Sequence, residues 1–309
     1  MSTTHSSSPI RIGTRGSLLA MAQADMVAAA LQKAGETTEI VVITTTGDKI
    51  LDRPLSEIGG KGLFTKEIEA AMLEGRIDCA VHSAKDLETI LPAELTLGAF
   101  LPREDVRDAF IGRAGQRLAD LAPGAVVGTA SLRRQALVRR ARPDLRCDIL
   151  RGNVQTRLRK LEEGVCEGTL LALAGLNRLG IAEVATEILP TDTFLPACAQ
   201  GAIAVEIRRD DDRLIAACQT IDDAATERMV RAERGFLAAL DGSCRTPIAG
   251  LATIEGEDIH ITGLVASPDG ERVEEITGRG ALTDAADVGY DAGRRLRARV
   301  GERFFEPLI

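Results

Sequence analysis

Short apolar runs alternate with helix-like segments along the first two-thirds of the chain. The runs are rich in Ile, Val, Leu and Thr, as buried β-strands are, and they lie at 10–13, 39–48, 77–83 and 95–102. Segments 18–35 and 61–75 place apolar residues at helical spacing, and each ends on a glycine, a common helix stop. The pattern predicts strands and helices in alternation.

The same alternation continues to residue 180. Strand-like runs open the segments 125–142 and 147–164, each followed by a turn and a helical stretch, and 169–180 is a strand ending in a short helix. Ser17 and Asn153 stand just before predicted helices, where their side chains can act as N-caps. Such alternation is typical of open, mainly parallel sheets with helices on both faces, whose ligands bind beyond the carboxyl ends of the strands.

The pattern changes after about residue 220. A helical segment at 226–240 is followed by the loop DGSCRTP, and a second helix at 289–305 closes the chain. Between them lie three strand-like runs at 247–254, 258–267 and 271–280, the last two joined by the turn SPDG. We predict a small α+β unit with a three-stranded antiparallel sheet.

Composition narrows the function classes. The chain has 309 residues and a net charge of −8, which argues against nucleic-acid and anionic-membrane partners. Aromatic residues make up only 3%, so stacking on bases is not expected. The polar start MSTTHSSSPI is unlike a secretion signal, and no apolar run approaches the roughly 18 residues of a membrane span. These features predict a cytoplasmic protein.

The six cysteines and three histidines are scattered. No cysteine pair has C-x-x-C spacing, so neither a metal site nor a disulfide framework is predicted. Cys79 and Cys147 lie in or beside apolar runs and are interpreted as small buried hydrophobic residues. Cys244 differs, because it stands in a polar loop.

Arginines gather after several predicted strands. Residues 129–160 hold nine arginines and one lysine against two aspartates, a local charge of +8. Those that follow strands or open helices are Arg15, Arg133, Arg134, Arg151, Arg157 and Arg178. Guanidinium groups beside helix N-termini bind carboxylates or phosphates, so a ligand with many negative charges is predicted. Arg139, Arg140, Arg142 and Arg159 could equally form a solvated helix face.

One acid lies among these bases. The run AVHSAKD places Ser83, Lys85 and Asp86 at the end of a predicted strand. A lone carboxylate there is as often a turn former as a catalytic group. Beside an anion-binding cleft, Asp86 could instead stabilise a positive charge or accept hydrogen bonds from N–H groups of the ligand.

Eight motifs together resemble one family. RIGTRGSLLAMAQ, GGKGLFTKEIEAAML, VHSAKD, GTASLRRQ, LRGNVQTRL, LALAGLNRLG, LPACAQGAIAVE and ERGFLAALDGSCRTPIAG occur in this order. Over nearly its whole length the chain resembles porphobilinogen deaminase, also called hydroxymethylbilane synthase. The resemblance implies three domains: 1–103 with 200–220, 104–199, and 221–309. The first two would resemble type II periplasmic binding proteins, and the third would carry the loop cysteine.

The resemblance also implies a reaction. Such a transferase of tetrapyrrole and haem biosynthesis adds four porphobilinogen molecules head to tail, with loss of ammonia, to a dipyrromethane cofactor held by a thioether. Water then releases hydroxymethylbilane. A monomer in the cytoplasm is implied, with porphobilinogen as its small-molecule partner and no metal.

The roles implied by the resemblance divide the candidate residues into three sets. Asp86 would be the catalytic aspartate, stabilising the cation left when ammonia departs. The cofactor would be held by Cys244, Ser83, Lys85, Thr129, Ser131, Arg133, Arg134 and Arg157. The substrate and the growing chain would be bound by Arg15, Ser17, Arg151 and Arg178. In this chain Glu88 stands two residues after Asp86, where the family usually has proline.

Two rival functions are weighed against this one. A binding protein of the periplasmic type would suit the first two domains but would not need a loop thiol. A cysteine hydrolase would need a histidine near Cys244, and neither His82 nor His260 has a recognisable partner in the sequence.

Overall fold

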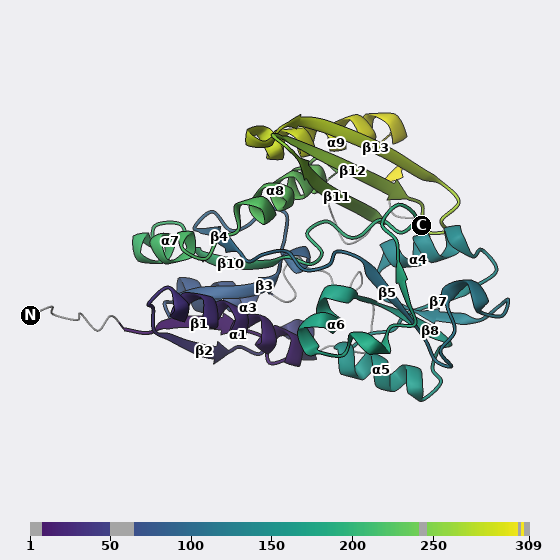
Figure 1. Ribbon diagram of the computed structural model, residues 1–309, viewed down its shortest axis with the longest axis horizontal. Coiled ribbons are helices and arrows are strands. Elements are labelled where there is room, and N and C mark those ends of the chain that lie inside the picture. Colours follow the sequence, from purple (N-terminus) through teal and green to yellow (C-terminus); the bar gives the residue numbers. More distant parts are fainter. Residues whose placement is uncertain (1–7, 50–64, 241–245, 302–303, 306–309) are drawn as a thin grey trace, which may run out of the picture. The chain divides into compact units, whose positions relative to one another are not determined.

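The computed structural model describes residues 8–49, 65–240, 246–301 and 304–305 (Figure 1). The chain divides into two compact units. Unit 1 comprises Met1–Ile50, Gly60–Arg103 and Ala202–Ala224, and unit 2 comprises Leu51–Gly59, Glu104–Gly201 and Ala225–Ile309. The division into three domains stays a prediction.

Unit 1 is built on a five-stranded sheet. Its strands, in spatial order, are β2 (Thr38–Val42), β1 (Ile10–Thr14), β3 (Cys79–Ser83), β10 (Ile203–Arg208) and β4 (Leu95–Phe100). β1 pairs in parallel with β2 and β3, whereas β10 runs antiparallel to both β3 and β4. Four strands therefore share one direction, as predicted, and β10 alone opposes them.

Helices cover both faces of this sheet. The helices of unit 1 are α1 (Leu18–Lys33), α2 (Thr46–Lys49), α3 (Lys66–Leu73) and α7 (Asp212–Gln219), with a 3-10 turn η1 (Ala84–Asp86). Val27 of α1 and Leu214 of α7 pack with Val81 on one face, and Met72 of α3 packs with Ala80 on the other. This is the alternating inward and outward packing expected of a buried strand.

Unit 2 contains a second five-stranded sheet of the same plan. Its strands, in spatial order, are β7 (Arg146–Asp148), β6 (Val126–Gly128), β8 (Gly168–Ala172), β5 (Asp108–Gly112) and β9 (Glu187–Leu189). β6 is parallel to β7 and β8, and β5 is antiparallel to β8 and β9. The accompanying helices are α4 (Leu132–Ala141), α5 (Val154–Glu162) and α6 (Leu173–Leu179), with 3-10 turns η2 (Leu118–Asp120) and η3 (Ala182–Val184).

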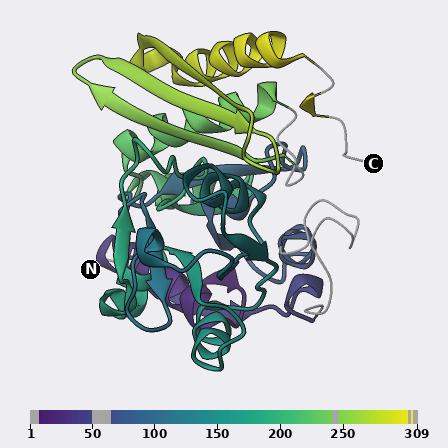
Figure 2. The same ribbon diagram turned by 90° about the vertical axis from the view of Figure 1, so that its right-hand side faces the viewer.

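A three-stranded antiparallel sheet completes unit 2, as predicted. It orders β11 (Ile248–Glu255), β12 (Asp258–Ala266) and β13 (Val273–Ala281), and it is accompanied by α8 (Ala224–Ala239), η4 (Leu282–Asp284) and α9 (Ala285–Val300). Figure 2 shows the three strands side by side with α9 running along them. Phe236 of α8 and Leu296 of α9 pack with Ile261 of β12.

Glycines let the two helices of this sheet approach closely. A Cβ on Gly289 of α9 would lie 1.8 Å from the carbonyl oxygen of Ala232 in α8. A Cβ on Gly235 of α8 would lie 2.2 Å from the carbonyl oxygen of Ala286. No side chain fits at either point, so the sequence must carry glycine there.

The structure contains elements that the sequence analysis did not identify. β5, β9, β10, α2 and α7 were not predicted. The strand predicted at 39–48 is too long, because β2 ends at Val42 and α2 begins at Thr46. β5 (DAFIG) and β10 (IAVEIR) are buried along almost their whole length, so neither shows the alternation of polar and apolar residues that marks a half-exposed strand, and each includes an acidic residue. None of the helices within the described parts of the chain is both long and apolar enough to cross a membrane.

Candidate active site

A small cavity lies in unit 1 at the carboxyl ends of β1 and β3. Its volume is about 80 Å³, and its lining comprises Arg15, Ser17, Leu19, Ala20, Gln23, Thr65, Val81, His82, Ser83 and Asp86. Arg15, Ser17, Ser83 and Asp86 were all singled out from the sequence. The structure brings these four together around one cavity, although up to 71 positions separate them in the chain.

Two of these residues owe their positions to the start of α1. Ser17 is the N-cap of α1, and its hydroxyl accepts a hydrogen bond from the backbone N–H of Ala20 at 3.3 Å. The predicted cap is therefore confirmed. Arg15 stands directly after the last residue of β1, at the strand end that faces the helix N-terminus. A cation at this point adds to the positive potential of the helix dipole and favours an anionic ligand.

The opposite wall comes from β3 and η1. The Ser83 hydroxyl lies 2.9 Å from Gln23 Nε2 and 3.2 Å from Gln23 Oε1, so these two side chains bridge β3 and α1. η1 begins at Ala84, whose backbone N–H donates a hydrogen bond to the carbonyl of Ala202 at 3.0 Å. It ends at Asp86, whose side chain is exposed. Lys85 is also exposed but does not line the cavity.

His82 also lines the cavity, although the sequence analysis gave it no role in the site. Its Nε2 lies 3.1 Å from Glu206 Oε2, and both side chains are buried, with 6% and 0% exposed. Oε1 of Glu206 is buried and has no hydrogen-bond partner within the described structure. The sequence analysis found no partner for His82, and the structure corrects this, since Glu206 lies 124 positions away on β10.

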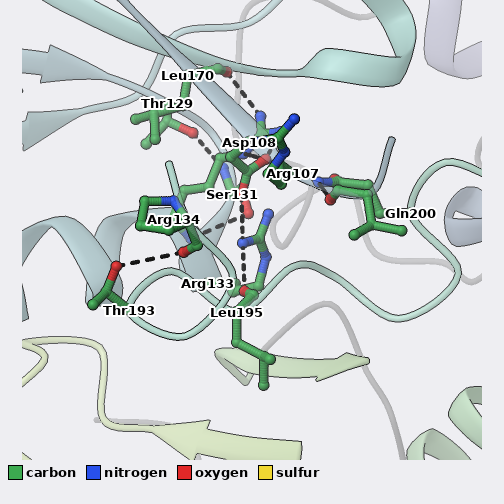
Figure 3. A network of polar contacts seen from close by, with 12 residues as sticks. Arg107, Asp108, Thr129, Ser131, Arg133, Arg134, Leu170, Thr193, Leu195 and Gln200 are labelled. Carbon is green, nitrogen blue, oxygen red and sulfur yellow. Dashed lines mark hydrogen bonds and ion pairs between the residues drawn. The ribbon is translucent and has the colours of Figure 1, made fainter. Parts of the chain in front are cut away.

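A second group of candidates surrounds Asp108 in unit 2. Asp108, the first residue of β5, is fully buried (Figure 3). Arg133 Nη1 donates to its Oδ2 at 2.7 Å, and Arg134 donates to its Oδ1 from Nη2 at 2.6 Å and from Nε at 3.1 Å. Gln200 Nε2 adds a further hydrogen bond at 3.1 Å.

Asp108, Arg133 and Arg134 together carry a net positive charge. Burial raises the pKa of Asp108, but the charges of the two neighbouring guanidinium groups outweigh it and hold that pKa well below its ordinary value. The carboxylate therefore offsets only one of the two cations. Both arginine residues are about 5% exposed, and Nε of Arg133 is buried without an acceptor among the described residues. The group retains a capacity to bind an anion.

The first turn of α4 positions both arginines. Ser131 is the N-cap, and its hydroxyl accepts from the N–H of Arg134 at 3.4 Å. The Ser131 N–H in turn donates to the Thr129 hydroxyl at 3.2 Å, and Thr129 is buried. Thr129 and Ser131 thus shape the turn between β6 and α4. Whether they also touch the cofactor stays a prediction.

The remaining predicted arginines lie at the ends of other elements in unit 2. Arg151 is buried in the loop between β7 and α5. Arg157 lies in the first turn of α5 and donates from Nε to the carbonyl of Gly152 at 2.8 Å. Gly152 has φ of +123°, which requires glycine. Asn153 caps α5 as predicted, because its side chain accepts from the N–H of Thr156 at 2.9 Å.

Arg178 lies near the end of α6 and is half-buried. Burial lowers the pKa of its guanidinium, an effect that the charge of Glu104 opposes. Its Nη2 donates to the carbonyl of Gly201 at 2.5 Å, and its Nε is buried with no acceptor in the described structure. A carboxylate ligand would satisfy that atom.

The four arginines left open by the sequence make local contacts. Arg142 binds Asp144 and three carbonyl groups, and Arg159 of α5 pairs with Glu163, the C-cap residue of that helix. Arg140 pairs with Glu275 at 2.9 Å, and Arg139 donates to the carbonyl of Pro268. These contacts favour the interpretation as a structural helix face.

The cysteines separate into two groups. Cys79, Cys166, Cys198 and Cys218 are buried free thiols, and Cys147 is half-buried. Burial raises the pKa of the Cys218 thiol to about 12, so this side chain is a poor nucleophile. Cys79 is confirmed as a small buried residue. Cys244 lies outside the described residues, and among those that are described no cluster of possible metal ligands occurs.

Comparisons with known proteins agree on one family. Residues 10–216 match the model of "Porphobilinogen deaminase, dipyromethane cofactor binding domain", and residues 228–298 match "Porphobilinogen deaminase, C-terminal domain". A curated relative from Nitrobacter hamburgensis, named porphobilinogen deaminase, is 60% identical over 95% of this chain and 94% of its own. One of the same name from Nitrobacter winogradskyi is 59% identical over the same shares. The chain belongs to the porphobilinogen deaminase family.

Solved structures offer weaker likenesses. A periplasmic substrate-binding protein of an ABC transporter from Coxiella burnetii is 14% identical over 71% of this chain and 94% of its own, with a TM-score of 0.43. A periplasmic binding protein from Salmonella typhimurium with high arginine specificity is 13% identical over 72% and 94%, with a TM-score of 0.39. Because both scores are low, the fold class rests on the sheet topology itself: two α/β sheets of one plan and a three-stranded antiparallel sheet.

Proposed function

We propose that this chain joins four porphobilinogen molecules head to tail on a dipyrromethane primer attached to Cys244, releasing ammonia and then, by hydrolysis, hydroxymethylbilane. Family membership supports this proposal across both matched segments. The observation that carries it is the cavity of unit 1, where Arg15, Ser17, Ser83 and Asp86 converge. The cation and the two hydroxyl groups suit the carboxylates of the substrate, and the carboxylate of Asp86 suits its aminomethyl group.

Asp86 is the catalytic residue of this proposal. Departure of ammonia takes the electrons of the C–N bond and leaves a cation shared with the pyrrole nitrogen. A fixed carboxylate beside that N–H stabilises the developing charge. Arg15 and Ser17, at the N-terminus of α1, would hold the substrate carboxylates at the other side of the cavity. Ser83, held by Gln23, would be oriented toward the same cavity.

The residues of unit 2 fit a polycarboxylate cofactor. When bound, the dipyrromethane group supplies the pyrrole end to which each new unit is joined. The two arginines around Asp108 carry one more positive charge than the carboxylate offsets, which attracts acetate and propionate groups. The Nε of Arg133, which has no acceptor among the described residues, can donate a hydrogen bond to such a group. In this proposal Lys85, Thr129, Ser131, Arg133, Arg134 and Arg157 hold the cofactor, while Arg151 and Arg178 hold the growing chain. The enzyme would act as a cytoplasmic monomer, which sedimentation and cell fractionation can test.

The mass of the intact protein tests the proposal directly. Purified protein should be heavier than its chain by one dipyrromethane unit and should give the pyrrole colour with acidic Ehrlich's reagent. Cys244→Ser should remove the adduct, and Cys218→Ser is the matched control that should keep it. An adduct that survives in Cys244→Ser, or that maps to another cysteine, would overturn the assignment.

A further inference from the structure

His82 is placed between the cavity of unit 1 and a buried carboxylate. In the antiparallel pairing of β3 with β10, His82 lies opposite Ala204 and Glu206 lies opposite Ala80. Opposite residues share a face of the sheet, so His82 and Glu206 are diagonal neighbours on one face. That face is the one covered by α3, and His82 reaches from it to the cavity wall.

The hydrogen bond between them sets the state of the ring. A carboxylate can only accept a hydrogen bond, so with Glu206 ionised the contact of 3.1 Å places the proton of the imidazole on Nε2. A neutral ring then keeps its lone pair on Nδ1. Among the described residues no side chain donates a hydrogen bond to that nitrogen, and His82 is one of the residues that line the cavity. His82 therefore offers a proton acceptor at the site, as histidines oriented by a carboxylate do in other enzymes.

Charged side chains from several elements lie around His82. Glu206 approaches from β10, Glu69 from α3 and Glu88 from the segment after η1, while Arg15 and Asp86 share the cavity wall. Burial raises the pKa of Glu69, and the charges of Glu206 and Glu88 raise it further. The face of the sheet covered by α3 thus holds Glu206 and Glu69 close to His82.

We propose that His82 accepts the proton released when each pyrrole unit is joined, and that Glu206 is the positioning residue that holds its tautomer. This inference rests on the proposed function. Joining two units forms a C–C bond at a ring carbon that still carries hydrogen. The C–H bond then breaks, its electron pair returns to the aromatic ring, and the proton passes to Nδ1 and afterwards to water. Asp86 is less suited to this step, because protonation would remove the charge that stabilises the cation.

Two variants test the proposal with readouts that a structural role would not move. In cofactor-loaded enzyme, His82→Asn should lower kcat by about a hundredfold or more, with a smaller change in KM. Porphobilinogen deuterated at the free ring carbon should then show a primary isotope effect larger than in the wild type. Glu206→Gln keeps the side-chain volume but removes the charge, so the acid limb of the kcat profile should move to lower pH by about one unit or more.

The chain provides a matched control for the second variant. His260 Nε2 faces Glu255 at 3.4 Å in the antiparallel sheet of unit 2, and Glu255→Gln should leave both kcat and its pH profile unchanged. Loading is checked by intact mass. If the wild type makes no hydroxymethylbilane, the proposed function itself fails. If the wild type is active but His82→Asn shows no larger isotope effect and Glu206→Gln leaves the acid limb unshifted, the inference about His82 alone is overturned.

Discussion

The two five-stranded sheets share one strand plan but use their antiparallel strand differently. In unit 1, β10 carries Glu206, which contacts one titratable side chain, His82, beside a cavity. In unit 2, β5 carries Asp108, which contacts two permanent cations, Arg133 and Arg134. A buried carboxylate on equivalent strands thus contacts one histidine beside a cavity in one sheet and two arginines in the other. The shared strand order determines where in each sheet a carboxylate is buried, and the side chains that contact this carboxylate determine its chemical role.

The largest effect is expected from breaking the Asp108 group. Asp108→Asn leaves two buried guanidinium groups without a counter-charge, which should lower the free energy of unfolding by about 3–5 kcal/mol in denaturant titrations. Asp105→Asn is the control, because Asp105 pairs with a half-exposed Arg107 and should cost less than about 1 kcal/mol. Equal losses in the two variants would contradict the central role of Asp108.

The same group makes stability depend on pH with a definite sign. The pKa of Asp108 is lowered in the folded state, so its stabilisation is present above the unfolded pKa of about 3.9 and is lost as pH falls toward the lower folded value. The difference in unfolding free energy between the wild type and Asp108→Asn should therefore be constant near neutrality and shrink below about pH 4. A difference that stays constant to pH 2 would assign the effect to packing.

The next effect concerns the carboxylate of the cavity in unit 1. Asp86→Asn keeps the size of the side chain but removes its charge, so turnover should fall by about a hundredfold or more in protein that is still loaded with cofactor. The melting temperature should change little, because Asp86 is exposed. Glu88→Gln is the control and should remain active. Near-normal turnover by Asp86→Asn would show that Asp86 is only a turn former.

The smallest effects should separate the arginines of unit 2 by role. Arg133→Ala or Arg134→Ala should lower the fraction of protein that carries cofactor, whereas Arg151→Ala or Arg178→Ala should give loaded protein that stalls at particular chain lengths. Intact-mass spectra after limiting substrate measure both quantities. Identical loading and identical chain lengths in all four variants would contradict the assignment of two arginines to the cofactor and two to the growing chain.

A triple variant sharpens this test against simple loss of stability. Replacing Asp108, Arg133 and Arg134 together by Leu, Met and Met removes the buried charges without leaving one unpaired, so stability should recover relative to Asp108→Asn. Cofactor loading should not recover if the arginines bind it. Recovery of loading would assign the arginines to folding alone.

The sequence by itself determined the elements with local signals. Strand–helix alternation placed most strands and helices, and the caps at Ser17 and Asn153 were predicted from residue type and position alone. The placement of Arg15, Ser83 and Asp86 at strand ends also followed from the sequence, and the ends of parallel strands meet at one edge of a sheet. Periodicity and caps act within a few residues, so they can be read along the chain.

Only the tertiary structure decided which distant groups meet. β5 and β10 escaped prediction because strands buried on both faces show no alternation. Their insertion into the two sheets brings Asp108 to arginines 25 and 26 positions away and Glu206 to a histidine 124 positions away. A buried charge is stabilised by the side chains that lie beside it in the folded sheet. Which side chains these are depends on how the strands pair, and strand pairing depends on the packing of the whole sheet rather than on any local pattern.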